Sequence, residues 1–181
     1  MPAAARSPDG PRAPLMVIGP VASGKSTLLA ALGLGPGGIK KTEALTYNGG
    51  MSIDTPGEML AIPRFYNALI LNSGRASVVL LLMDGRKPMW LPAKICLALR
   101  ARVAGVVTKT DVAEPGGLGR AETALTAAGV DKIFKISSVT GQGLEELREW
   151  LAANGCALPD QNAGDGGGDG QNAGDDPDVD N

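Results

Sequence analysis

The 181-residue chain contains no histidine, few aromatic residues and only two cysteines. The absence of histidine excludes histidine general bases, histidine metal ligands and a Ser-His-Asp triad. Aromatic residues make up 3% of the chain, which suits aliphatic strand and helix layers better than an aromatic-lined binding face. Cys96 and Cys156 lack metal-ligand spacing, so we interpret Cys96 as a small buried residue and Cys156 as an incidental tail residue.

Long apolar segments are also lacking. The longest wholly apolar run, residues 78–83, is far too short to span a bilayer, and the N-terminal residues contain no secretory hydrophobic segment. We therefore expect a cytoplasmic protein without membrane insertion. No long basic block interleaves with aromatic residues, which argues against nucleic acid as a partner.

Charge and composition divide the chain into three parts. Residues 160–181 contain seven Asp and no Lys or Arg, so the rest holds 17 basic and 12 acidic residues, an excess of five. Residues 1–14 contain four prolines and few apolar side chains. We predict a disordered arm at 1–14, one folded domain at 15–154 and a disordered acidic Gly/Asn/Asp tail at 155–181.

Apolar runs alternate with helical patterns throughout the folded part. Strands are predicted at 15–18, 42–47, 51–54, 77–83, 103–108 and 132–136, and helices at 24–32, 59–72, 91–101, 118–129 and 144–153. Asn48-Gly49-Gly50 is typical of a tight hairpin turn, which makes one strand antiparallel to the others. The order predicts an α/β fold, with a six-stranded, mostly parallel sheet covered by helices on both faces.

The pattern G-x-x-x-x-G-K-S at residues 19–26 lies between the first predicted strand and the first predicted helix. In this context it indicates a phosphate-binding loop rather than an ordinary glycine-rich turn. Loop N–H groups would surround phosphate oxygens, Lys25 would reach the β- and γ-phosphates, and Ser26 would ligate Mg²⁺. The predicted phosphate contacts are Gly19, Val21, Ala22, Ser23, Gly24, Lys25, Ser26 and Thr27.

A second motif, Asp54-Thr55-Pro56-Gly57, ends the third predicted strand. Asp54 would hold a water on Mg²⁺, and the Gly57 N–H would contact the γ-phosphate. Thr42 is placed to complete the Mg²⁺ shell, the alternative being a threonine that merely opens a strand. Ser26, Thr42 and Asp54 are therefore the predicted metal-site residues.

A third motif, Thr108-Lys109-Thr110-Asp111, ends the fifth predicted strand. The Asp111 carboxylate can accept both N1–H and N2–H of guanine, whereas adenine offers no such donor pair. Lys109 can lay its stem against the base and brace the phosphate loop, with Thr108 beside it. The turn Ser137-Ser138-Val139 can offer N–H groups to the guanine carbonyl. These residues predict GTP as the ligand, with ATP as the alternative.

Together these motifs resemble those of the Ras-like P-loop GTPases, and more closely those of the EutP/PduV family. The matching segments are residues 18–26, 40–44, 53–58, 66–70, 106–111 and 133–143. The resemblance implies a Ras-like G-domain fold and a role in ethanolamine or propanediol utilisation. It also implies a link to bacterial microcompartments, with a shell or pathway protein as partner. Within the family some members are treated as GTPase-like and others as ATP-binding, and an acetate-kinase activity has been proposed.

Two positions predict slow hydrolysis. Glu58 follows Gly57 where Ras-like enzymes carry a water-orienting glutamine, and a carboxylate opposes the charge of the transition state. The alternative is that Glu58 only caps the following helix. Val21 stands where Ras has glycine and should obstruct an arginine finger, while Arg64 is either a finger in cis or a solvated helix residue. Lys25, Gly57 and Glu58 are the predicted catalytic residues.

Five basic residues near the predicted third helix suggest a partner-facing surface, or simply a solvated one: Arg86, Lys87, Lys94, Arg100 and Arg102. Three functions remain open from the sequence. The first is a Mg²⁺-dependent guanine-nucleotide switch with slow hydrolysis, the second a small-molecule kinase that phosphorylates acetate, and the third a nucleotide-loaded adaptor without hydrolysis.

Overall fold

The computed structural model describes residues 14–34, 46–48, 52–60, 62–156 and 158–159. Their elements are, in order, β1 (Leu15–Ile18), α1 (Lys25–Ala31), β2 (Thr46–Asn48), β3 (Ser52–Asp54), η1 (Gly57–Leu60), η2 (Pro63–Phe65), α2 (Tyr66–Ser73), β4 (Val78–Asp84), η3 (Ile95–Ala98), β5 (Arg102–Thr108), α3 (Pro115–Ala127), β6 (Ile133–Lys135) and α4 (Leu144–Ala153). Almost all of the predicted arm and tail, and residues 42–45 of the second predicted strand, lie outside these residues.

In the described residues, the strands form one sheet of six, in the order β2-β3-β1-β4-β5-β6. Five strands are parallel, and β2 pairs antiparallel with β3. The α/β class with a mostly parallel sheet is thereby confirmed. Because neighbouring parallel strands point the same way, the segments that follow β1, β3, β4, β5 and β6 all begin at one edge of the sheet.

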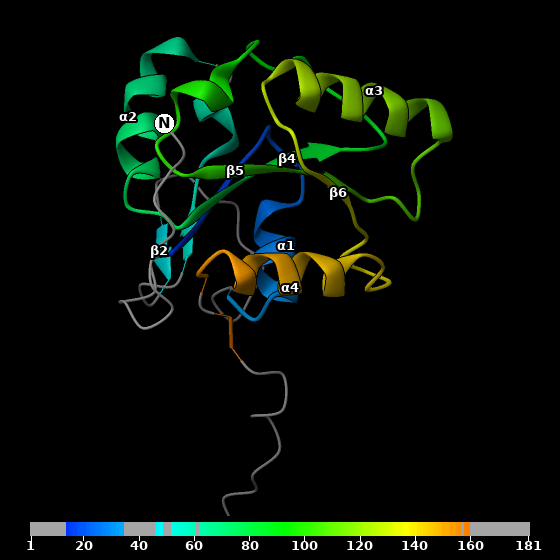
Figure 1. Cartoon of the computed structure of the whole chain (residues 1–181). Coiled ribbons are helices and arrows are strands. Elements are labelled where there is room, and N and C mark those ends of the chain that lie inside the picture. The colour runs from blue at the N-terminus through cyan, green and yellow to red at the C-terminus, as the bar shows by residue number, and fades with distance from the viewer. Residues whose placement is uncertain (1–13, 35–45, 49–51, 61, 157, 160–181) are drawn as a thin grey trace, which may run out of the picture.

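Alternate residues along the strands point to opposite faces of the sheet, and each face packs against helices in its own apolar layer (Figure 1). Leu15 and Val17 of β1 pack with residues of α1 and α4 on one face. Met16 and Ile18 point to the other face, which α2, η3 and α3 cover. All four β1 side chains are fully buried, and each such burial stabilises the fold by about 1.5–3 kcal/mol. The strand is thus fixed in register, and so is the loop that leaves it.

Two predicted helices are wrong, and proline explains the first. The single helix expected at 59–72 is split into η1, η2 and α2. Pro63 cannot donate a backbone hydrogen bond and biases Ile62 toward extended backbone, with φ −119° and ψ 108°. Helix α2 therefore begins only at Tyr66.

The helix expected at 91–101 reduces to the four-residue η3. Lys94 has φ 58°, and Leu99 is extended, so neither end can continue as a helix. The N–H groups of Lys94 and Cys96 instead donate to the carbonyls of Ala127 and Ala128 at the end of α3. This tertiary pairing outcompetes the local helical pattern. No helix among the described residues is long and apolar enough to cross a membrane.

The two thiols lie in separate layers of the core. Cys96 is buried as predicted, but the interpretation of Cys156 as an incidental tail residue is wrong, because it is only 4% exposed and packs with the α1–α4 layer. Burial raises the pKa of each thiol to about 12. Both therefore stay protonated and unreactive near neutral pH.

Candidate functional site

The loop between β1 and α1 has backbone angles that require small residues. Gly24 precedes α1 with φ 89°, in the left-handed region that glycine adopts without strain. A Cβ on Gly19 would lie 2.7 Å from the Leu82 carbonyl oxygen and 2.7 Å from Ser23 Oγ. Both positions therefore need glycine: Gly24 for its backbone angle and Gly19 for lack of space. With glycine there, the loop can curve so that its backbone N–H groups face inward.

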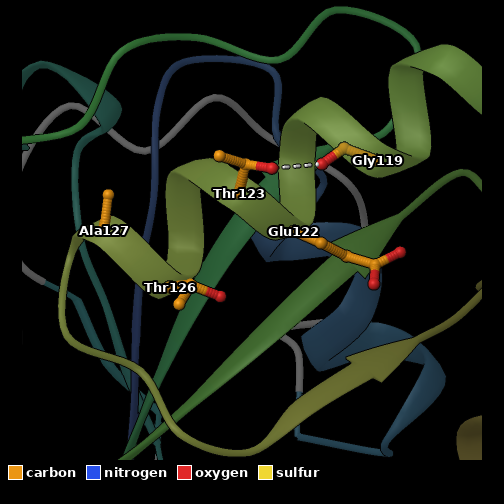
Figure 2. Close-up of a pocket in the computed structure, with 5 residues that line it drawn as sticks. All are labelled: Gly119, Glu122, Thr123, Thr126 and Ala127. Carbon is orange, nitrogen blue, oxygen red and sulfur yellow. Dashed lines mark hydrogen bonds between the residues drawn. The ribbon is translucent and has the colours of Figure 1, made fainter.

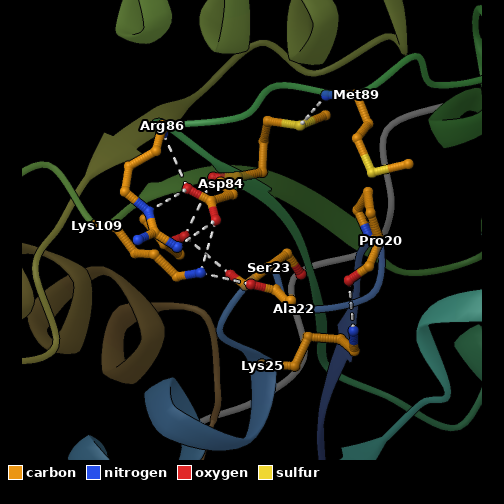
Figure 3. Close-up of polar contacts among 10 residues, drawn as sticks. Pro20, Ala22, Ser23, Lys25, Asp84, Arg86, Met89 and Lys109 are labelled. Atoms are coloured by element: carbon orange, nitrogen blue, oxygen red, sulfur yellow. Dashed lines mark hydrogen bonds and ion pairs between the residues drawn. The ribbon is translucent and has the colours of Figure 1, made fainter. Parts of the chain in front are cut away.

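Lys25 is the first residue of α1, and its side chain turns back into this loop, so the residue is only 7% exposed. Its Nζ donates to the carbonyls of Gly19 at 3.0 Å and Pro20 at 2.8 Å, as Figure 3 shows for Pro20. Burial lowers the pKa of Lys25 below 10.5, and the carboxylates of Asp54 and Glu58 partly oppose that shift. A desolvated ammonium surrounded by acceptors interacts strongly with any anion that enters the loop.

Two of the three predicted metal-site residues are brought together. Ser26 Oγ donates to Asp54 Oδ2 at 2.9 Å, although 28 residues separate them in the chain. Hydroxyl and carboxylate oxygens are the donors that Mg²⁺ prefers, so this pair fits the cation. Thr42 lies outside the described residues. Within the part of the chain that the structure covers, no group of three or more His, Cys, Asp or Glu side chains could hold a metal.

The segment after β3 lies directly on the phosphate loop. Thr55 Oγ1 donates to the Val17 carbonyl at 2.9 Å, which ties this segment to β1. A Cβ on Gly57 would clash with the backbone N of Val21 and would lie 2.6 Å from its Cα. Glu58 follows in the first turn of η1 and is half-buried. Gly57 therefore borders the position predicted for the γ-phosphate.

We expect Gly57→Ala to lower GTP affinity about ten-fold and to leave GDP affinity nearly unchanged. The new methyl cannot fit against Val21, so the segment must move and withdraw the N–H that would meet the γ-phosphate. Titration of both nucleotides checks this result. Gly119→Ala is the matched control, because a Cβ there meets nothing within 4 Å. Equal losses for GTP and GDP would contradict a specific role toward the γ-phosphate.

The end of β5 is joined to the phosphate loop by two side chains. Thr108 Oγ1 donates to the Ser23 carbonyl at 2.9 Å. Lys109 Nζ donates to the Ala22 carbonyl at 2.6 Å, so it braces the loop as its sequence position predicts (Figure 3). Lys109 holds φ 60°, a left-handed conformation that costs a lysine energy. The motif predicted for the base and the loop predicted for the phosphates thus form one connected unit.

The remaining base-site residues lie at the same edge. Asp111 is exposed, so its carboxylate is open to a ligand. The N–H of Thr110 donates to the Ile136 carbonyl at 3.2 Å, which joins this motif to the turn after β6. In that turn Ser137 is buried and its Oγ accepts N–H bonds from Val139 at 3.3 Å and Thr140 at 3.1 Å. Ser138, between Ser137 and Val139 in the chain, is half-buried.

Sequence reasoning missed Asp84, the last residue of β4. Its carboxylate accepts from Lys109 Nζ at 2.6 Å and from the Arg86 backbone at 2.9 Å. The signal was present, because Asp84 ends a buried strand just as Asp54 does. Its role could not be predicted from the sequence, because that role depends on β5 lying beside β4 in the sheet.

The predicted basic surface does not form one cluster. Arg86 lies just beyond Asp84, whereas Arg102 begins β5 and donates to Asn154. Arg102 is paired with Val78 in the sheet and Asp84 with Thr108, so the two arginines lie at opposite strand ends, roughly 20 Å apart at 3.3 Å per residue. Arg64 lies in η2 with its guanidinium over the Phe65 ring, 4.9 Å from the centroid.

A shallow hollow of about 510 Å³ lies elsewhere, on the outer side of α3 (Figure 2). Its lining is Gly119, Glu122, Thr123, Thr126 and Ala127, all from one helix. Thr123 already donates to the Gly119 carbonyl at 2.9 Å. The hollow contains no residue of the phosphate loop.

The fold and the loop geometry define a P-loop nucleotide-binding protein with a Ras-like G-domain fold. A crystal structure of translation elongation factor SelB from Methanococcus maripaludis, in complex with the GTP analogue GPPNHP, is similar with a TM-score of 0.59 at 20% sequence identity. The match covers 79% of this chain and 33% of that chain, so this chain spans about a third of SelB. At this identity the likeness shows the fold.

The family model for PduV-EutP, described as ethanolamine utilisation - propanediol utilisation, matches residues 13–153. The propanediol utilization protein PduV of Citrobacter freundii is 31% identical over 141 residues, covering 77% of this chain and 93% of that protein. The probable acetate kinase EutP of Escherichia coli K12 is 29% identical over 138 residues, covering 75% and 87%. The chain belongs to the PduV-EutP family.

Proposed function

We propose that the protein is a Mg²⁺-dependent guanine-nucleotide switch with slow intrinsic GTP hydrolysis, which serves ethanolamine or propanediol utilisation. The observation that carries the proposal is the pair of bonds from Thr108 and Lys109 to the phosphate loop. They tie the segment that carries Asp111 to the loop, which supports one ligand contacting both the loop and Asp111. A guanine base on a triphosphate has the required donors and charge.

Each residue has a definite task in this proposal. Lys25 moves its ammonium from loop carbonyls toward the β- and γ-phosphates, and the loop N–H groups bind the remaining oxygens. Ser26 and Asp54 would hold Mg²⁺, which neutralises phosphate charge when bound. The backbone N–H of Gly57 would donate a hydrogen bond to the γ-phosphate, so this segment would respond to whether the γ-phosphate is bound. Asp111 selects the base, with backbone N–H groups of residues 137–139 on the guanine carbonyl.

Slow hydrolysis follows from Glu58. A carboxylate at that position cannot donate a hydrogen bond to the transition-state oxygens, and it adds negative charge where charge accumulates. With saturating GTP and Mg²⁺ we expect single-turnover hydrolysis on the order of 10⁻³ s⁻¹ or slower. A rate on the order of 10 s⁻¹ without any partner, as in fully activated GTPases, would refute the proposal.

Glu58→Gln should raise that rate roughly ten-fold or more, because an amide can both orient water and donate to the transition state. Phosphate release under single-turnover conditions measures the change. Glu149→Gln, on the exposed surface of α4, is the matched control and should leave the rate within about two-fold. An unchanged or lower rate in Glu58→Gln would show that Glu58 does not limit hydrolysis.

The name of the EutP relatives supports a second candidate, phosphoryl transfer from ATP to acetate. The two candidates differ in product. Formation of acetyl phosphate from ATP and acetate, at a rate above GTP hydrolysis, would favour the kinase. A nucleotide-loaded adaptor would show neither reaction. The family membership supports a microcompartment shell or pathway protein as partner, with the protein in the cytoplasm or at the microcompartment surface.

A further inference from the structure

Asp84 occupies a junction between three segments. Its side chain is 13% exposed and pairs with Lys109, just after β5, and with Arg86, in the loop after β4. The Arg86 backbone N–H donates to Oδ1 at 2.9 Å, with Nε 3.5 Å from Oδ1 and Nη2 3.4 Å from Oδ2 (Figure 3). Backbone and guanidinium together fix the carboxylate so that Oδ2 faces Lys109.

The bond from Lys109 to Asp84 is short and charge-assisted. Lys109 Nζ lies 2.6 Å from Asp84 Oδ2 and 2.6 Å from the Ala22 carbonyl, so one ammonium joins β4 to the phosphate loop. Burial alone would raise the pKa of Asp84, but hydrogen bonds from Lys109 and Arg86 outweigh it and hold the pKa below its usual range. The carboxylate is therefore ionised at neutral pH and attracts the ammonium fully.

Without this carboxylate, Lys109 would keep only a neutral acceptor on the loop. Its side chain is 27% exposed, so water would compete for the ammonium. The left-handed backbone conformation of Lys109 costs energy, so contacts with neighbouring groups are needed to hold the residue in place. Thr108 would remain as the other brace, through one neutral hydrogen bond. Loss of Asp84 should therefore loosen the link between the two halves of the site without unfolding either.

We propose that Asp84 is a positioning residue for nucleotide retention: it holds Lys109 on the phosphate loop, so that the base and phosphate halves grip the ligand as one unit. The inference rests on the proposed nucleotide site. Asp84 itself need not touch the ligand. Its removal should therefore accelerate nucleotide release while leaving the chemistry of bound nucleotide unchanged.

The test is the dissociation rate of mant-labelled GDP and ADP from the full chain with Mg²⁺, measured by stopped flow. Asp84→Ala should release the nucleotide roughly ten- to hundred-fold faster than wild type. Asp84→Asn keeps an oxygen acceptor and should fall between. Glu122→Gln removes a different ion pair, with Lys135 at 2.8 Å, and should stay within about two-fold.

Two further readouts separate positioning from a merely structural role. Single-turnover hydrolysis at saturating GTP should stay within about two-fold in Asp84→Ala, since the reacting groups are intact. The rise in Tm that nucleotide produces should shrink, because that rise follows affinity. Release rates within two-fold of wild type would overturn the inference, as would a lower Tm without nucleotide and an unchanged nucleotide-induced rise.

Failure of the proposed function has a different signature. If wild type retains ADP and not GDP, the guanine preference fails, and the effect of Asp84 is still read on ADP release. If it retains GDP and Asp84→Ala releases it at the wild-type rate, only the role of Asp84 fails. Retention of neither nucleotide by wild type overturns both.

Discussion

Asp111→Asn is expected to lower GTP affinity about a hundred-fold or more and to raise the affinity for XTP. In the proposed complex the carboxylate accepts N1–H and N2–H of guanine, and each such bond to a charged group contributes about 1.5–3 kcal/mol. An asparagine keeps one acceptor and gains a donor, which suits the carbonyl at C2 of xanthine. Titration of GTP and XTP with the purified variant measures both changes.

Exposure makes this substitution a clean test. Asp111 is exposed, so the change should leave the fold intact, and unfolding without nucleotide should match wild type. Asp131→Asn, at another exposed aspartate in the loop before β6, is the matched control and should leave both affinities unchanged. If Asp111→Asn still prefers GTP as strongly as wild type, then Asp111 does not recognise the base.

Lys25→Met is expected to lower the affinity for any nucleoside triphosphate by roughly a hundred- to thousand-fold. The variant keeps the apolar stem and removes the ammonium, and with it two charge-assisted bonds to phosphate. The loss should be similar for GTP and ATP, because the proposed contacts of Lys25 are with the phosphates and not with the base. Isothermal titration of both nucleotides gives the affinities, and circular dichroism verifies the fold.

Lys132→Met is the control for Lys25→Met. Lys132 is half exposed and pairs with Glu146 at 3.0 Å, on the surface between β6 and α4. Surface ion pairs of this kind contribute little to stability, and this one is not among the proposed nucleotide contacts. Nucleotide affinity should therefore stay within about two-fold of wild type. Retained GTP affinity in Lys25→Met, with an intact fold, would mean that the loop does not bind phosphate as proposed.

The segments that the sequence predicted best are those in which local pattern and tertiary packing agree. β1 and α4 have the predicted bounds, because β1 is apolar on both faces, α4 is apolar on one face, and a glycine stands at a boundary of each. The helices expected at 59–72 and 91–101 failed where proline and pairing with α3 overrode the periodicity. Such pairing joins residues about thirty apart and has no local signal.

The site was predictable to a similar extent. Motif order placed Lys25, Ser26 and Asp54 at one sheet edge, since parallel strands end together. The brace from Lys109 to the loop followed from the same reasoning. Asp84 did not, because its role depends on the strand order β1-β4-β5, which brings β4 between the two motifs. The predicted basic cluster does not form, because Arg86 follows the end of β4 whereas Arg102 lies beside the start of β4.

The most direct test of the central claim is the affinity of the wild-type chain for GTP and for ATP, titrated in parallel with Mg²⁺. The two ligands share the triphosphate, so the phosphate loop treats them alike, and only the base motif can separate them. We predict that GTP binds about a hundred-fold or more tightly than ATP, from the two hydrogen bonds to Asp111. Equal affinities, or tighter binding of ATP, would contradict the guanine-nucleotide switch.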